Sequence, residues 1–196
     1  MTKDLISALR PALVMTLLFA VLLGIAYPLA LTGIGQTLFP SQANGSLVRE
    51  NGRVVGSTVV GQAFGSERYF HTRPSAAGDG YDGLASSGSN LGPTSRALAA
   101  RVKGDIARLS ETAPGRPVPP DLVTTSASGL DPDISPEAAF YQVERVARAR
   151  GLDPAAVRRL VDRSVERPLL GFLGEPRVNL FKLNRRLDAF GAKPAT

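Results

Sequence analysis

Residues 11–31 read PALVMTLLFAVLLGIAYPLAL and carry no charged side chain. At about 1.5 Å of rise per residue, a helix of this length is roughly 31 Å long, which matches the ~30 Å hydrocarbon core of a bilayer. No other part of the chain has an apolar run of comparable length. The stretch therefore predicts one transmembrane helix followed by one water-exposed domain.

A cleaved signal peptide and a buried core helix are the competing interpretations of this stretch. A signal peptide has an apolar region of about 7–15 residues and a small-x-small cleavage site. This run is longer, and the AYPLA of residues 26–30 offers no clean Ala-x-Ala. A core helix usually has a polar stripe, whereas only Thr16 and Tyr27 are polar here. A membrane anchor fits both observations.

The charges that flank the span indicate its orientation. Lys3 and Arg10 precede it against one Asp4, and the next charge after it is Arg49. The positive-inside rule then places the N-terminus in the cytoplasm and the rest outside it. The predicted organisation is a cytoplasmic N-terminus (1–10), a transmembrane helix (11–32), a linker (33–45) and an extracytoplasmic domain (46–196).

Small residues along the span would allow it to pack closely against other transmembrane helices in the bilayer. They are Ala12, Ala20, Gly24 and Ala26.

Composition excludes several classes of function. The chain has no cysteine, so disulfides and thiolate chemistry are absent. Its 23 basic residues against 17 acidic ones give only a mild positive charge. The arginines are spread and interleaved with acids, which is typical of solvated helix faces rather than of a nucleic-acid interface. We therefore expect no nucleic-acid partner.

The water-exposed part is predicted to be an α+β domain with a small β-sheet and about four helices. Asn51-Gly52 between two β-prone runs predicts a hairpin over 46–60. A long Gly-, Ser- and Pro-rich loop follows over 61–93, and a short strand is expected at 122–125. Apolar spacing and caps predict helices over 94–109, 136–150 and 154–165 and a last helix capped by Asn179.

Candidate catalytic residues are few. His71 is the only histidine, and a serine hydrolase would need it beside Ser126, Ser128 or a serine of the group at 86–89. No Gly-x-Ser-x-Gly elbow is present, and a histidine hydrogen-bonded within an aromatic-rich loop is the favoured interpretation of His71.

Metal and nucleotide signals are also weak. The acids of residues 131–133 sit among prolines and caps, so turn formation explains them. The acids of 79–83 lack the spacing and distal Glu of a calcium loop. No P-loop pattern occurs. From the residues alone we assign no catalytic, cofactor-binding or metal-binding residue.

The loops contain several long and distinctive sequence motifs. They are GQAF at 61–64, YFHTRPS at 69–75, ASSGSNLGPT at 85–94, PPDLVTTSASGLDP at 119–132, ISPEAA at 134–139, GFLGEPRVNL at 171–180 and LN at 183–184. In this order, and together with the single N-terminal span, they closely resemble the KdpC subunit family of the bacterial Kdp potassium-transporting ATPase.

The resemblance implies a non-catalytic accessory subunit of a high-affinity potassium import complex in the bacterial cytoplasmic (inner) membrane. The implied partners are a KdpA-like potassium-translocating subunit, a KdpB-like P-type ATPase subunit and, as a further candidate, a small KdpF-like peptide. ATP and K⁺ would be handled by these partners, with no cofactor bound directly by this chain. The family role is assembly and service as a catalytic chaperone that raises the ATP affinity of the ATPase subunit.

The predicted orientation constrains that role. A domain outside the cell cannot contact cytoplasmic ATP, so its effect on ATP affinity would be a coupling between separate sites. We expect the loops of 61–93 and 119–135 to form the subunit interface, with Asn90, Ser126, Ser128 and Asp131 as candidate contact residues. A membrane-anchored extracytoplasmic serine hydrolase that uses His71, and a stand-alone binding module, remain as alternatives.

Overall fold

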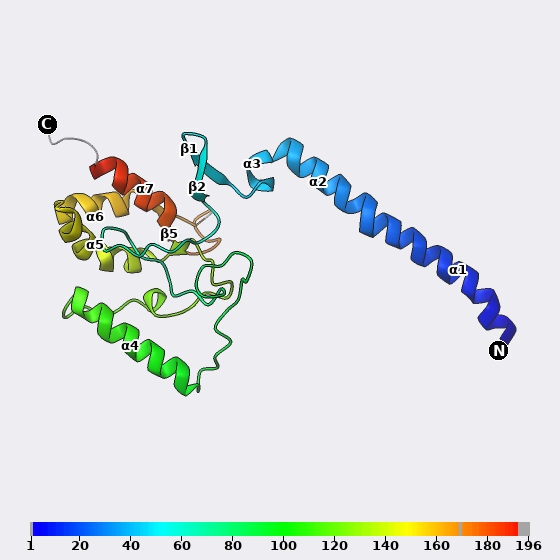
Figure 1. The fold of residues 1–196 in the computed structure, drawn as a ribbon, viewed down its shortest axis with the longest axis horizontal. Coiled ribbons are helices and arrows are strands. Elements are labelled where there is room, and N and C mark those ends of the chain that lie inside the picture. Colours follow the sequence, from blue (N-terminus) through cyan, green and yellow to red (C-terminus); the bar gives the residue numbers. More distant parts are fainter. Residues whose placement is uncertain (1, 169, 192–196) are drawn as a thin grey trace. The chain divides into compact units, whose positions relative to one another are not determined.

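A computed structural model describes residues 2–168 and 170–191 (Figure 1). The chain divides into two compact units, Met1–Leu47 and Val48–Thr196. The residues after Gly191, which the sequence assigned to the end of the soluble domain, lie outside the described part. Each unit is described by itself.

The first unit is almost entirely helical. Helix α1 (Thr2–Val21) continues through a π-helical turn (Leu22–Ala26) into α2 (Tyr27–Leu38), and the short α3 (Pro40–Ala43) follows. Residues 6–38 form one helix that is long and apolar enough to cross a membrane, with none of its hydropathy window buried. The expected single apolar helix is thus confirmed as a helix, and it runs beyond the expected end near residue 32.

The π turn has a local cause in the sequence. Pro28 has no N–H, and in a regular helix its ring would press on the carbonyl of Gly24, four residues earlier. The helix widens there, and the N–H of Tyr27 donates to the carbonyl of Leu22, five residues back. The helix therefore passes Pro28 without ending.

Residues 33–38 were expected to begin a linker but are helical. Two glycines in this stretch, Gly33 and Gly35, do not break the helix, and the Thr37 hydroxyl donates to the carbonyl of Gly33 at 2.8 Å. The helix ends at Leu38, where Phe39 leaves the helical region with φ −134° ahead of Pro40.

Beyond the first unit, the described residues form two small antiparallel sheets and four α-helices of nine or more residues. Strands β1 (Leu47–Glu50) and β2 (Arg53–Ser57) form the predicted hairpin, whose Asn51 and Gly52 have the expected positive φ angles. Strand β5 (Arg177–Asn179) lies between β3 (Asp133–Ile134) and β4 (Val165–Glu166).

The helices of this unit begin where their caps predict. In α5 (Pro136–Arg150) the Ser135 hydroxyl accepts the N–H of Ala138, and Gly151 ends the helix at φ 68°. Asp153 caps α6 (Pro154–Asp162) in the same way, and the Asn179 side chain accepts the N–H of Lys182 at the start of α7 (Leu180–Gly191).

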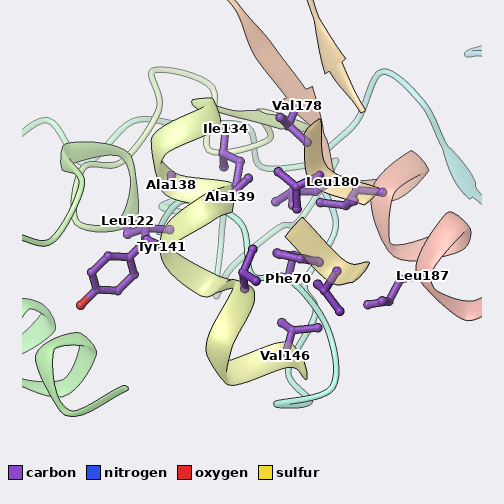
Figure 2. Packing of buried hydrophobic residues seen from close by; sticks show 14 of the residues in the cluster. Phe70, Leu122, Ile134, Ala138, Ala139, Tyr141, Val146, Val178, Leu180 and Leu187 are labelled. Atoms are coloured by element: carbon purple, nitrogen blue, oxygen red, sulfur yellow. The ribbon is translucent and has the colours of Figure 1, made fainter. Parts of the chain in front are cut away.

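Helix α5 lies in the middle of the hydrophobic core. Figure 2 shows Phe70, Val146 and Leu187 on one side of it and Leu122 and Tyr141 on the other. All five side chains are buried. Helix α4 (Arg96–Thr112) is different, because none of its residues is buried and it reaches the core mainly through Leu109 near its end (Figure 1).

The short strand expected at 122–125 is wrong. Residues Pro120–Leu122 form a 3-10 turn instead, and the N–H groups of Val123 and Thr124 both donate to the carbonyl of Pro120. Two successive prolines favour this turn, and the turn places Leu122 in the core.

Candidate interaction site

The two loops predicted to form an interface, residues 61–93 and 119–135, are bound to each other by hydrogen bonds. We call their exposed side the two-loop surface. The N–H of Gly61 donates to the carbonyl of Leu130 at 2.7 Å. The N–H of Ser87 and the hydroxyl of Ser86 both donate to the carbonyl of Ser128, at 3.1 and 2.9 Å. These loops are therefore ordered by their own backbone polar groups.

Glycines allow this close approach. A Cβ at Gly61 would lie 2.5 Å from the carbonyl oxygen of Asp131. A Cβ at Gly129, whose φ is +67°, would lie 2.6 Å from the nitrogen of Ala77 and 2.7 Å from the carbonyl oxygen of Ser87. Both contacts are far shorter than real Cβ contacts, so no side chain fits at either position.

Ser75 joins the two loops through several hydrogen bonds, a role that the sequence analysis did not predict. Its hydroxyl donates to the carbonyl of Gly129 at 2.6 Å and accepts the N–H groups of Ala77 and Tyr81. The Tyr81 hydroxyl in turn contacts the carbonyl of Arg73 and the Thr72 hydroxyl. Burial is the main cause that raises the pKa of Tyr81 above its usual value, so this phenol stays protonated and serves as a structural donor.

Asp131, one of the predicted contact residues, is mainly engaged within the loops. Its carboxylate accepts Arg73 Nη1 at 3.1 Å and the N–H of Asp133 at 3.0 Å. Arg73 also donates to the Thr124 carbonyl and hydroxyl, both at 3.3 Å. This half-buried ion pair ties the two loops together, and such a tie is not visible in sequence because its partners are 58 residues apart.

The other predicted contact residues occupy more open positions. Asn90 and Ser128 are exposed and Ser126 is half-buried. The Ser128 hydroxyl accepts the N–H of Leu130 at 3.1 Å, and Asn90 has a positive φ of 52°. Ser126, Ser128 and Asp131 share one loop, while Asn90 belongs to the facing loop.

Three polar side chains hold the segment 67–71, which begins with a turn at Glu67 and Arg68 and pairs with no described strand. The buried Asn184 amide accepts the N–H of Phe70 and donates to its carbonyl, at 2.9 and 3.0 Å. Gln142 does the same for His71 at 2.7 and 3.0 Å. Arg145 donates to the carbonyls of Glu67 and Tyr69 and to Gln142. We call Gln142, Arg145 and Asn184 the amide clamp.

His71 lies at the end of that segment and does not have the surroundings of a catalytic base. In the part of the chain that the structure describes, its Nε2 pairs with the carbonyl of Ser66 at 3.0 Å rather than with a serine hydroxyl. Burial, followed by the positive charge of Arg145, lowers the pKa of His71 below 6.5. The Ser86 hydroxyl, a former candidate nucleophile, donates to a backbone carbonyl instead. The hydrolase alternative finds no support in this geometry.

The carboxylates weighed as metal ligands have other partners. Asp133 accepts the Asn179 amide at 2.9 Å and pairs with Arg177 at 3.3 Å, and Asp82 accepts the N–H of Leu84 at 2.8 Å. Over residues 2–168 and 170–191 no group of three or more His, Cys, Asp or Glu side chains is placed to hold a metal ion.

The small residues of the apolar helix are exposed along it. A Cβ added at Gly24, inside the π turn, would meet no atom within 4 Å. The packing role of Ala12, Ala20, Gly24 and Ala26 remains a prediction.

Comparison with known proteins gives a consistent result. Residues 9–189 match the model of the KdpC family, described as the c chain of the K⁺-transporting ATPase. The chain is 59% identical over 186 residues to a protein of Caulobacter vibrioides, covering 94% of both chains. It is 54% identical over 192 residues to one of Methylorubrum extorquens, covering 92% of this chain and 96% of the other.

A third relative, from Rhodopseudomonas palustris, is 52% identical over 197 residues, covering 94% of this chain and 98% of its own. All three relatives carry the name potassium-transporting ATPase KdpC subunit. The similarity includes both the apolar helix and the second unit.

Proposed function

Since the chain belongs to the KdpC family of K⁺-transporting ATPase subunits, we propose that it is a non-catalytic accessory subunit that supports assembly and raises the ATP affinity of the ATPase subunit indirectly. The observation that carries this proposal is the family match over residues 9–189, which spans the anchor and the domain together. The proposed partners are a KdpA-like translocating subunit, a KdpB-like P-type ATPase subunit and a KdpF-like peptide. ATP and K⁺ are bound by these partners.

The hydrogen bonds that the loop hydroxyls and His71 make to backbone groups support the proposal that the chain is non-catalytic. Ser75, Ser86 and Ser128 use their hydroxyls in bonds to loop backbone. A nucleophile needs an adjacent base, and the His71 ring instead bonds a carbonyl. The loops are therefore built as a scaffold.

The exposed apolar residues of the second unit support a role in assembly. Val54 and Val59 of the hairpin region are about half-exposed, and Leu84 is fully exposed. A two-stranded hairpin is marginal in water unless something packs on it. A partner subunit that covers these residues would gain roughly 25 cal/mol for each Å² of apolar surface removed from water.

Purification from potassium-starved bacteria tests the proposal. The full chain with a C-terminal tag is extracted in mild detergent, and we expect a polytopic channel-like subunit and a P-type ATPase to co-purify with K⁺-stimulated ATP hydrolysis. The ATP KM of the complex is then compared with that of a preparation lacking this chain, and we expect the KM to rise without it. Recovery of the intact chain alone would refute the subunit role.

The two-loop surface is tested as an interface by a change that leaves its internal bonds intact. Asp131→Ala is unsuitable, because it removes the tie to Arg73. Ala127→Arg, on the same loop, places a large cation on an exposed position and removes no side-chain hydrogen bond. We expect the yield of co-purified partners to fall about tenfold, which corresponds to about 1.4 kcal/mol. Glu144→Arg on the exposed side of α5 is the control. Equal yields for the two variants would place the interface elsewhere.

The orientation is tested with single cysteines, because the chain has none of its own. We propose that Ser128→Cys reacts with an impermeant thiol reagent in intact cells freed of any outer membrane, and that Lys3→Cys reacts only after lysis. The reverse pattern would place the domain in the cytoplasm and would make direct contact with ATP possible.

A further inference from the structure

The turn between β4 and β5 presents three large apolar side chains to solvent. Leu170, Phe172 and Leu173 are 75, 73 and 52% exposed. A bond from the N–H of Gly171 to the carbonyl of Pro168 closes the turn, and Leu170 and Gly171 both have positive φ angles. Apolar groups exposed together on a soluble domain usually mark a contact with a protein or a membrane. We call residues 170–173 the apolar turn.

The base of the apolar turn is held by ion pairs. Glu166 of β4 faces Arg177 of β5 across the sheet, at 3.4 Å between the charged groups. Lys182 also binds Glu166, at 2.8 Å, and Arg177 reaches Asp133 at 3.3 Å. The turn thus extends from a fixed pair of strands, so its tip is presented at a defined place.

Chain connectivity limits how far the start of the second unit can lie from the apolar helix. The apolar helix ends at Leu38 and the second unit begins at Val48. The residues between them span at most about 35 Å even when fully extended. A lipid surface is therefore always near the domain, on whichever side of the membrane the domain lies.

The charges beside the apolar turn fit a lipid headgroup layer. Arg167 precedes it and is exposed. Arg177, which follows it, is also exposed but is already paired with Glu166 and Asp133. The acid Glu166 at its base is neutralised by Lys182 and Arg177, which leaves Glu175 as the exposed acid nearest to the turn in the sequence. Leucine and phenylalanine flanked by arginine are typical of segments that enter the interfacial layer of anionic membranes. A stable protein interface needs about 800 Å² on each partner, which three side chains on one turn do not supply.

We propose that the apolar turn inserts Leu170, Phe172 and Leu173 into the interfacial layer of a lipid bilayer, with Arg167 at the depth of the lipid phosphates. This second attachment fixes the domain against the membrane surface. It is independent of the proposed role in potassium transport.

The chain has no tryptophan, so one introduced tryptophan reports on its own surroundings. Full-length Phe172→Trp is reconstituted in vesicles of phosphatidylcholine and phosphatidylglycerol, with and without bromine atoms on the acyl chains. We expect its emission to be shifted to the blue and to be reduced at least about twofold by the brominated lipid. Leu173→Trp is expected to behave alike and guards against a local defect at position 172.

Leu84→Trp is the matched control, since Leu84 is 100% exposed on a different loop. We expect it to emit as a solvated indole and to keep its intensity in brominated vesicles. Adding Arg167→Glu to Phe172→Trp should weaken the quenching in anionic vesicles. Emission from position 172 that is unquenched overturns the proposal. If that unquenched emission is still blue-shifted, the turn is covered by protein, either this domain or a second copy of the chain.

Discussion

At the scale of single residues, Gly129 is the position where the two loops depend most on the absence of a side chain. Gly129→Ala would strain a φ of +67° and bring a Cβ to 2.6 Å from the nitrogen of Ala77. We expect this substitution to lower the free energy of unfolding by about 3 kcal/mol, of which about 1–2 kcal/mol is backbone strain. Urea unfolding of the detergent-solubilised chain, followed by circular dichroism, measures the change.

Gly151→Ala separates the cost of backbone strain from the cost of the steric clash of an added Cβ. Gly151 has nearly the same φ, +68°, but no atom lies within 4 Å of an added Cβ. It should therefore cost only the strain, about 1 kcal/mol. Equal losses for the two variants would mean that the close packing of the loops around Gly129 contributes nothing.

His71 gives the chain a defined response to pH. Burial and then Arg145 lower its pKa from 6.5, so the folded state favours the neutral ring more than the unfolded state does. Its contribution to stability is complete above the unfolded pKa of 6.5 and is lost as the pH falls through the lower, folded pKa. Because His71 is the only histidine, its ring proton signal in an NMR titration reports this pKa directly.

We expect the titration midpoint to lie below 6.5. In His71→Gln the loss of unfolding free energy between neutral and mildly acidic pH should become smaller. A midpoint at or above 6.5 would contradict the burial of this ring.

At the scale of elements, the amide clamp supplies hydrogen-bond partners to backbone groups of segment 67–71, which is neither helix nor strand. Gln142 of α5 and Asn184 of α7 are 3 and 1% exposed, and each bonds both backbone groups of one residue in the segment 67–71. Asn184→Leu would leave the N–H and carbonyl of Phe70 buried without partners. We expect a loss of about 2–4 kcal/mol in the free energy of unfolding, because orphaned buried groups cost more than a net hydrogen bond contributes.

Gln142→Leu should behave like Asn184→Leu, whereas Glu144→Gln on the exposed side of α5 should change stability by less than about 0.5 kcal/mol. Hydrogen exchange at Phe70 and His71 is the direct measurement. Fast exchange in the unaltered protein would show that the clamp does not protect this segment.

Whether a helix, hairpin or turn could be predicted from the sequence depends on how close together the residues lie that determine it. Helix α5 was predictable because Ser135, Pro136 and Gly151 act on neighbouring residues, and the hairpin because Asn51-Gly52 defines its own turn. The 3-10 turn at Pro120–Leu122 was mistaken for a strand, because the β-prone residues 122–125 were given more weight than the two prolines that precede them.

The same distinction between local and distant contacts applies to the candidate interaction site. Sequence reasoning predicted that both loops form an interface, and the aromatic residues within 61–93 favoured a packed rather than a disordered loop there. It could not find the bond from Ser75 to Gly129 or the bonds from the amide clamp to segment 67–71, because these join residues 54 to 114 positions apart. It also treated Asp131 as a contact residue, when much of its carboxylate is used to tie the loops together.

At the scale of the whole molecule, the hydrophobic core cluster of the second unit contains no residue of the apolar helix. Every member of the buried core cluster lies between Phe70 and Leu187. We therefore expect residues 46–196, produced without the apolar helix, to fold and to unfold in one cooperative transition. Differential scanning calorimetry measures this, and a chain that shows no transition would prove that the helix is part of the folding unit.

We nevertheless expect the anchor to be indispensable for association, since it would insert into the membrane and carries the small residues Ala12, Ala20, Gly24 and Ala26. Replacing residues 11–32 with a poly-leucine span of equal length preserves insertion into the membrane and removes the small residues. If close helix packing matters, this variant will reach the membrane, keep the melting temperature of the domain, and recover about tenfold less of its partners, a change of about 1.4 kcal/mol. Recovery equal to that of the natural chain would mean that the anchor acts only as a tether, and that the second unit carries all of the recognition.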